Sequence, residues 1–271
     1  MLWILRSVVT LVVSGIFIIG TYCGAFPSSV KEKISITVVY DNYKINPNLA
    51  PSWGFGCVIK TPRKDILFDT GGDSSILLSN MNKMNINPKD IDIVFISHIH
   101  GDHIGGLNGF LEKNGNVKVY IPASFPDSIR EKIKSYGAEC FDVKDSMKIF
   151  DNVYTTGEMG TWIKEQSLVL DTRKGLIVIT GCAHPGVIDI AKKTKEILAN
   201  KKIYLFMGGF HLSSASDSEL ENIIKEFRDL GIKRVAPSHC SGDRSRELFR
   251  EEYKEDYVES GLGKVITIPG G

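Results

Sequence analysis

Three of the six histidines in this 271-residue chain fall within six consecutive positions, directly after a hydrophobic run. The run at 91–97 predicts a buried strand, and His98, His100 and His103 follow it, with Asp102 between the last two. Side chains of an extended segment alternate with period two, so His98 and His100 project to the same side and can bind one cation. Asp102 and His103 can reach a second position where the chain turns toward the next helix. Imidazole and carboxylate suit zinc and similar metals, so the sequence predicts a metal centre at this turn.

The other three histidines each follow a predicted strand. His184 lies in GCAHPG after LIVIT, His211 in GGFHL after IYLFM, and His239 in SHCSG after RVAP. Loops that follow strands at one edge of an α/β sheet converge on one cleft, where ligands bind. We therefore expect these histidines to join the first cluster.

The order of the predicted elements indicates an α/β fold. Short β-branched and aromatic runs at 34–40, 54–60 and 66–68 predict an opening antiparallel meander. Asp73 is a suitable N-cap for the first helix. The expected helices cover 74–84, 106–112, 126–136, 187–199, 217–230 and 244–253, and the other expected strands cover 91–97, 117–121, 147–150, 153–155, 167–171, 176–180, 203–207, 235–237 and 265–268. No linker rich in Pro, Gly or Ser divides them, so we expect one domain with two sheets between helical layers.

The first 30 residues differ from the rest of the chain. Residues 7–30 carry no charged side chain, and a helix over 7–26 would rise about 30 Å, the thickness of a bilayer core. Arg6 before this segment and small residues at 23–25 after it fit a cleaved secretory signal, and an uncleaved membrane anchor is the alternative. Lipidation at Cys23 and a buried core helix are further interpretations. We expect an extracytoplasmic or membrane-anchored protein whose folded domain spans 31–271.

Charge and cysteine content limit the partners. Lys plus Arg total 33 and Asp plus Glu total 32, a net charge of +1. Without a long basic run, this balance does not favour nucleic acid and indicates a small-molecule substrate. Four of the five cysteines would remain after cleavage behind Ala25. That number permits disulfides but does not imply a disulfide scaffold.

The run from His98 to His103 resembles the HxHxDH signature of the metallo-β-lactamase superfamily. The resemblance covers most of 34–268 and implies an αββα sandwich of two mixed sheets with metallo-hydrolase activity. Asp69, in FDTG, resembles the family's Asp-Thr-Gly turn, whose carboxylate is expected to support the metal loop. His239 resembles the last metal histidine of the family, and His184 fits a further ligand. The resemblance thus implies two divalent ions, one held by His98, His100 and His184 and the other by Asp102, His103 and His239.

Two departures from the family pattern leave roles open. Cys182 stands in Thr-Gly-Cys where most members have Thr-Gly-Asp with a bridging carboxylate. It is a thiolate ligand, a small buried residue beside the metals, or half of a disulfide with Cys240, and we favour the buried residue. No histidine lies between His103 and His184, where the third motif usually supplies a ligand, and Glu158 occupies roughly that region. The motifs SHIHGDHIGG, TGE, TGCAHPG, GGFHL and PSHCSG together resemble the branch of dihydropterin ribofuranosyl-aminobenzene phosphate synthase-like proteins.

The expected reaction is hydrolysis or group transfer assisted by two metal ions, with zinc favoured and manganese or iron as alternatives. Asp102 would orient the attacking water. His211 is a ligand, a general acid or a donor to a substrate phosphate, and we favour a role on the substrate side. Small phosphoesters or phosphodiesters rank first as substrates, followed by lactones and thioesters. A metal-containing ligand sensor without turnover is a contrasting class. A flavodiiron-like redox site is another, weakened because Cys182 replaces the bridging carboxylate.

Overall fold

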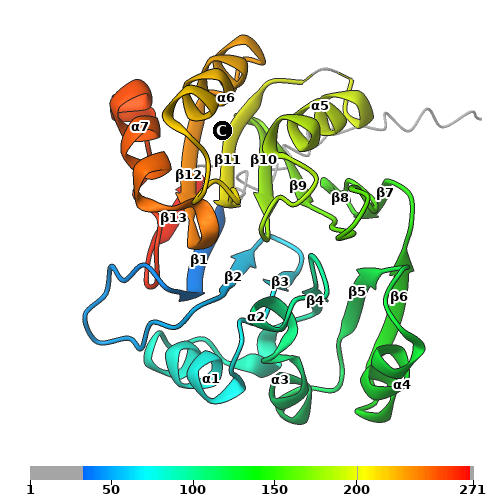
Figure 1. Ribbon diagram of the computed structural model, residues 1–271. Helices are drawn as coiled ribbons and strands as arrows, with labels where there is room; N and C mark the ends of the chain where they lie inside the picture. Colours follow the sequence, from blue (N-terminus) through cyan, green and yellow to red (C-terminus); the bar gives the residue numbers. More distant parts are fainter. Residues whose placement is uncertain (1–32, 200, 269–271) are drawn as a thin grey trace, which may run out of the picture. The chain divides into compact units, whose positions relative to one another are not determined.

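Two β-sheets form the centre of the fold in the computed structural model, which describes residues 33–199 and 201–268 (Figure 1). The first sheet contains β1 (Ile34–Asp41), β2 (Phe55–Lys60), β3 (Asp65–Phe68), β4 (Ile93–Phe95), β5 (Lys118–Pro122), β6 (Glu139–Val143) and β13 (Val265–Ile268), in the order β13-β1-β2-β3-β4-β5-β6. The second contains β7 (Met147–Phe150), β8 (Val153–Thr155), β9 (Leu168–Thr172), β10 (Gly175–Thr180), β11 (Ile203–Gly209) and β12 (Arg234–Ser238), in the order β12-β11-β10-β9-β8-β7. Strands β3 to β6 are parallel, as are β10 to β12, and the other neighbours are antiparallel. Both sheets are therefore mixed.

Helices cover the outer face of each sheet. The first sheet is covered by α1 (Ser74–Lys83), α3 (Leu107–Lys113) and α4 (Asp127–Ser135), and the second by α5 (Val187–Ile197), α6 (Asp217–Asp229) and α7 (Asp243–Tyr253). One buried cluster joins Leu77 and Phe110 to Val58 of β2, and another joins Ile190 and Phe227 to Val178 of β10. The predicted αββα sandwich is confirmed, because each sheet buries one face against helices and the other against its partner sheet.

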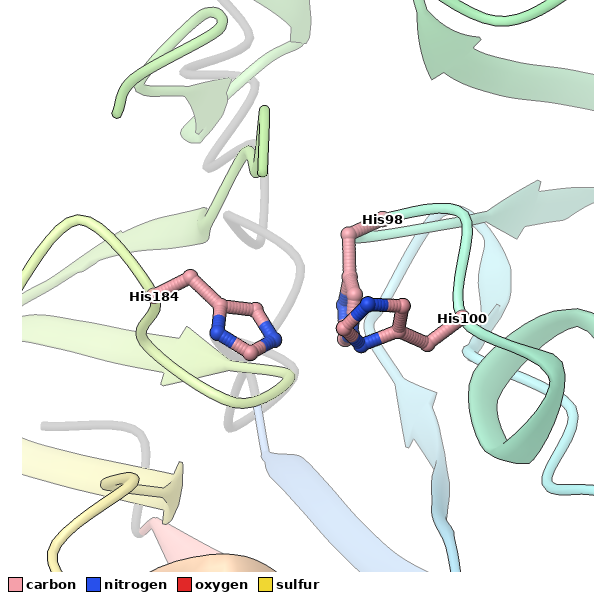
Figure 2. A group of neighbouring side chains, drawn as sticks. All are labelled: His98, His100 and His184. Atoms are coloured by element: carbon pink, nitrogen blue, oxygen red, sulfur yellow. The ribbon is translucent and has the colours of Figure 1, made fainter. Parts of the chain in front are cut away.

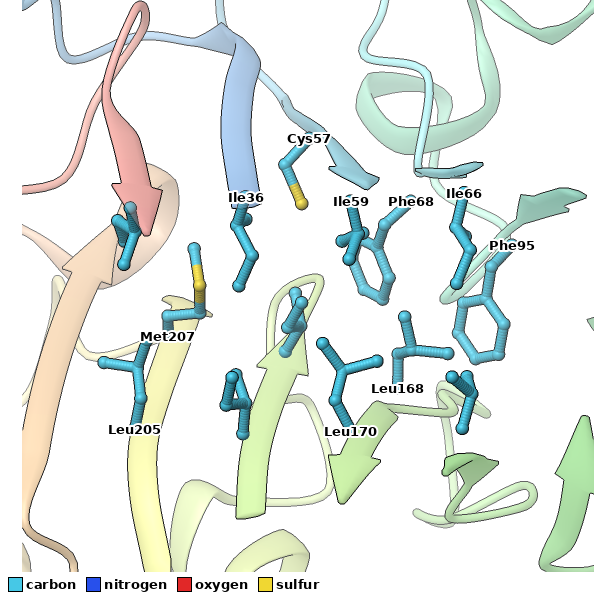
Figure 3. Packing of buried hydrophobic residues seen from close by; sticks show 14 of the residues in the cluster. Ile36, Cys57, Ile59, Ile66, Phe68, Phe95, Leu168, Leu170, Leu205 and Met207 are labelled. Atoms are coloured by element: carbon cyan, nitrogen blue, oxygen red, sulfur yellow. The ribbon is translucent and has the colours of Figure 1, made fainter. Parts of the chain in front are cut away.

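The core between the sheets follows from the period-two alternation of the strands. Ile36, Ile59 and Phe68 of the first sheet lie opposite Leu168 and Leu205 of the second (Figure 3). Their neighbours along each strand, such as Val58 beside Ile59, turn to the helical layer instead. This apolar layer holds the two sheets together, so that loops from both sheets can form one site.

Local signals predicted most helices and strands, with informative exceptions. Asp73 caps α1, because its carboxylate accepts from Ser75 N at 2.7 Å and Ile76 N at 3.1 Å. Strand β6 was not expected, because it is an edge strand with exposed Glu139 and Asp142 and lacks a hydrophobic pattern. The short helix α2 (Gly101–Ile104) and three 3-10 turns, η1 (Pro88–Asp90), η2 (His239–Ser241) and η3 (Lys254–Asp256), were also not expected. Helical elements of three or four residues make about one turn, which is too short for a helical period to show in the sequence.

The predicted signal or anchor, residues 1–30, lies outside the part of the chain that the structure describes. Within 33–199 and 201–268, no helix is both long and apolar enough to cross a membrane. The four cysteines of this part are free thiols, so Cys182 and Cys240 do not form the disulfide that was one of the alternatives.

Candidate metal centre

All six histidines meet where strands of the two sheets end. His98 and His100 follow β4, His184 follows β10, His211 follows β11, and His239 follows β12. Each imidazole ring, including that of His103, has its centroid within 5.0 Å of another histidine ring. One detail of the expectation was wrong. Strand β4 ends at Phe95, so His98 and His100 lie in the following loop, where His100 is the N-cap of α2, and not on an extended strand.

His98, His100 and His184 form a first group of converging nitrogen atoms. His98 Nε2 lies 3.2 Å from His100 Nδ1, and the His184 ring centroid lies 4.8 Å from that of His98 and 4.9 Å from that of His100. Figure 2 shows His184 reaching toward the other two rings from the opposite side. One nitrogen from each of the three residues lies within 4.8 Å of the others, close enough to bind a single ion.

The chemistry of this first group fits a metal ion. Within the described ranges, His184 Nε2 is a buried polar atom with no hydrogen-bond partner, which is costly unless an ion binds it. Burial and neighbouring imidazoles lower the pKa of His98 well below its ordinary value and that of His184 to about 4. Both rings are therefore neutral near pH 7, and the neutral imidazole is the form that binds metals.

Asp102, His103 and His239 form a second group. Asp102 Oδ2 lies 3.2 Å from His239 Nε2, and the two Nε2 atoms of His103 and His239 lie 3.3 Å apart. Burial would raise the pKa of Asp102, but the hydrogen bond from His239 and the charge of His103 outweigh burial and lower it. An ionised carboxylate and two imidazoles that share one small space are a donor set for a divalent first-row ion. The two groups have the same membership as the two predicted ligand sets.

Asp69 holds the loop that carries His98, His100, Asp102 and His103. Its Oδ2 lies 2.7 Å from His103 Nδ1 and accepts a 2.7 Å hydrogen bond from Ser97 Oγ, while its Oδ1 accepts from Ser97 N at 2.7 Å. The ring of His103 therefore directs Nε2 toward His239. A carboxylate behind a metal-binding histidine fixes its tautomer and orientation.

Cys182 lies between the two groups. Its Sγ is 3.2 Å from His103 Nε2, and it shares one potential ion site with His98 and His103 and another with His239 and Cys240. The side chain is buried, as expected, and the position also allows a thiolate ligand. The hydrogen bond with Cys240 and burial raise the pKa of Cys182 in the absence of metal.

His211 lies at the outer side of the first group. Its ring centroid is 4.5 Å from that of His184, and the residue is exposed. Its nitrogen, that of His184 and the sulfur of Cys182 lie within 4.8 Å of one another. This position agrees with a contact to substrate and also allows a place among the ligands.

Sequence reasoning missed two residues and selected one that lies elsewhere. Glu158 Oε1 accepts from Ser124 N at 2.6 Å, and Glu158 belongs to none of the potential ion sites among the described residues. Glu165 instead is the fully buried carboxylate behind the centre, where its Oε2 lies 4.0 Å from His98 Nδ1. Asn42 Oδ1 lies 2.9 Å from His239 Nδ1 and orients that ring. The only local signal for Glu165 is an acidic residue shortly before a hydrophobic run.

Four of the eight non-glycine residues with positive φ in the described ranges lie at the centre. Their φ angles lie in the left-handed region that non-glycine residues rarely adopt. The values are 52° at Asp69, 62° at Ala183, 53° at His211 and 49° at His239. At Gly181, an added Cβ would lie 2.1 Å from Ser97 Oγ, so only glycine lets the end of β10 approach that residue. Strain that the surrounding structure maintains is common at functional sites.

The family comparison agrees with this geometry. The family model described as the metallo-beta-lactamase superfamily matches residues 57–188. The chain belongs to the metallo-β-lactamase superfamily, and the relatives that it matches include enzymes. The predicted family and fold class are therefore confirmed.

Individual relatives narrow the position within the superfamily. The chain is 30% identical over 248 residues to the 7,8-dihydropterin-6-methyl-4-(beta-D-ribofuranosyl)-aminobenzene-5'-phosphate synthase of Methanocaldococcus jannaschii, covering 75% of this chain and 84% of the relative. The crystal structure of Tm1679, a metal-dependent hydrolase of the beta-lactamase superfamily, has a TM-score of 0.72 and 28% identity and covers 87% of this chain and 99% of that one. The ribonuclease Z of Nanoarchaeum equitans is 30% identical over 127 residues, 45% of this chain and 32% of the relative. The expected likeness to the phosphate synthase branch is thus present.

Proposed function

We propose that this protein is a hydrolase that binds two divalent ions, with zinc as the favoured metal, and cleaves a small phosphoester or phosphodiester. The observation that supports it most is the pair of ligand groups, His98, His100 and His184 on one side and Asp102, His103 and His239 on the other. Two such groups next to each other are typical of sites that bind both the attacking and the leaving oxygen of a phosphate ester. When bound, the ions supply Lewis-acid chemistry that acidifies a water nucleophile and stabilises negative charge on the substrate.

The protein's own residues orient the reactants. Asp102 is about a quarter exposed, with a side-chain accessibility of 24%, so its carboxylate can accept a hydrogen bond from the nucleophilic water as well as hold an ion. His211 lies beyond His184 on the exposed side and can donate a proton to the leaving oxygen or a hydrogen bond to a phosphate.

The preference for phosphate esters draws on the relatives. One relative is named as a 5'-phosphate synthase, and several are named ribonuclease Z. The ribonuclease matches are partial, and the net charge of +1 does not favour a long nucleic acid. A small phosphate ester is therefore the substrate class that we favour.

The test is a metal and substrate panel on the purified full-length chain. We expect up to two ions per chain by mass spectrometry, and hydrolysis of an aryl phosphomonoester or phosphodiester that a chelator abolishes and zinc, manganese or iron restores. Bound metal without turnover of any ester would favour the sensor. Turnover confined to lactones or thioesters would refute the phosphate substrate while leaving the metal centre intact. Full activity after complete metal removal would refute the proposal as a whole.

A further inference from the structure

The carboxylate of Glu165 is buried and accepts hydrogen bonds from four consecutive backbone N–H groups. Its Oε1 accepts from residues 181 and 182 at 3.0 Å and from residue 183 at 2.9 Å. Its Oε2 accepts from His184 N at 2.9 Å. The side chain has no solvent-exposed surface. Consecutive N–H groups that surround one anion form a backbone nest, and here the anion belongs to the protein itself.

This nest shapes the loop that carries Cys182 and His184. Ala183 has φ of 62°, in the left-handed region that non-glycine residues rarely adopt. The turn lets the N–H groups on both sides of Ala183 face one point. Four hydrogen bonds converge on this one side chain from both sides of Ala183, so Glu165 can maintain the strained turn.

Glu165 is itself fixed to the opposite side of the centre. Its backbone exchanges hydrogen bonds with Met159, at 2.9 Å and 3.1 Å, and the next residue, Gln166, donates from its N–H to Ser97 O at 3.0 Å. Ser97 directly precedes His98, whose Nδ1 lies 4.0 Å from Glu165 Oε2. The backbone next to Glu165 is therefore bonded to the loop of the first sheet that carries His98, while its side chain binds the loop of the second sheet that carries His184.

We propose that Glu165 is a positioning residue of the metal centre, whose carboxylate fixes the backbone at 181–184 so that His184 completes the group with His98 and His100. The inference rests on the proposed function in one respect, because the group that His184 completes is the candidate metal site. The carboxylate does not contact substrate in this role. It sets the distance between ligands from two sheets before an ion binds.

Replacement by glutamine tests the carboxylate without changing its size. In one orientation of the amide, the oxygen keeps the three bonds from residues 181–183 and the NH₂ group faces His184 N, donor against donor. In the other orientation, the NH₂ group faces three donors. The first orientation loses fewer hydrogen bonds. We therefore expect the backbone of the glutamine variant to be displaced at His184 and not at Cys182.

The experiment compares Glu165→Gln with Glu158→Gln in the full-length chain. The control carries the same substitution on the same connecting segment, where the carboxylate accepts from only one backbone N–H, that of Ser124. The probe is Co²⁺ alone, titrated against a chelator and followed by absorption and by ions bound per chain. We expect Glu165→Gln to lower the affinity for one of the two Co²⁺ ions by about 10- to 100-fold and to change the ligand-field spectrum of that ion. We expect Glu158→Gln to bind like wild type. Equal affinities and spectra in all three proteins would overturn the inference.

A second measurement needs no variant and so decides the matter if Glu165→Gln does not fold. Amide hydrogen exchange of the wild-type chain is followed at 181–184 after complete metal removal. Slow exchange is expected, because Glu165 holds the loop without an ion. Rapid exchange that becomes slow only with metal would show that the ion positions the loop and would overturn the inference. Neither readout requires turnover, so a protein that hydrolyses no ester refutes the proposed function without affecting this result.

Discussion

Asp69 offers a direct test of how the second ligand group is held, through the substitution Asp69→Asn. The carboxylate contacts Ser97 N, Ser97 Oγ and His103 Nδ1, each at 2.7 Å, and is fully buried. In the asparagine variant, the oxygen can keep the bond from Ser97 N, which places the NH₂ group against His103 Nδ1. That nitrogen must then accept, so the ring proton moves to Nε2, the atom that faces His239.

The magnitude follows from these contacts. All three contacts lose the charged acceptor, and with about 0.5–1 kcal/mol lost at each contact, the substitution costs the metal-free fold about 1.5–3 kcal/mol. For a domain of this size, that loss lowers the unfolding midpoint by about 3–12 °C. The shifted tautomer removes the free lone pair of His103, so affinity for one ion should fall by about 10- to 100-fold.

The assay is a chelator-competition titration of zinc, with thermal unfolding of the metal-free proteins alongside. The matched control is Asp92→Asn, at the opposite end of β3, where the carboxylate accepts from Asp65 N at 2.9 Å. The control is expected to keep two ions at wild-type affinity. If Asp69→Asn also binds two ions as tightly as wild type, Asp69 does not set the tautomer of His103 and the reasoning fails.

Four further outcomes are expected. Asp102→Asn should keep the fold but lose affinity for one ion and lower kcat by several decades, since the carboxylate acts on the attacking water, and steady-state kinetics with metal analysis measures both. His211→Ala should retain both ions and lose about 10²- to 10⁴-fold in rate for poor leaving groups, with less for good ones; loss of an ion instead would place His211 among the ligands. Deletion of residues 1–30 should leave a folded metal-binding domain by circular dichroism, because β1 begins at Ile34. In the metal-free protein, burial lowers the pKa of His184 from 6.5 to about 4, so the unfolded chain binds a proton between these values that the folded chain does not. Stability should therefore fall as pH falls from about 6.5 to about 4, and His184→Asn should flatten that dependence in denaturant titrations; an identical slope in both proteins would contradict the assignment.

The sequence by itself determined the fold class and most of the ligand candidates. Period-two runs and helical runs are local properties, so the strands, the helices and their order could be predicted from the chain alone. The spacing of His98, His100, Asp102 and His103 is local as well. The placement of His184 and His239 after strands was sufficient to predict that they would join this cluster.

Only the tertiary structure decided which residues support those ligands. Glu158 and Glu165 are seven residues apart in one segment, and sequence reasoning selected Glu158. The packing of the two sheets instead places Glu165 beneath the loop at 181–184 and brings Asn42 against His239. Such pairs are separated by 19 and 197 positions along the chain. A supporting contact of this kind depends on the approach of distant strands, and a pattern of neighbouring residues carries no information about that approach.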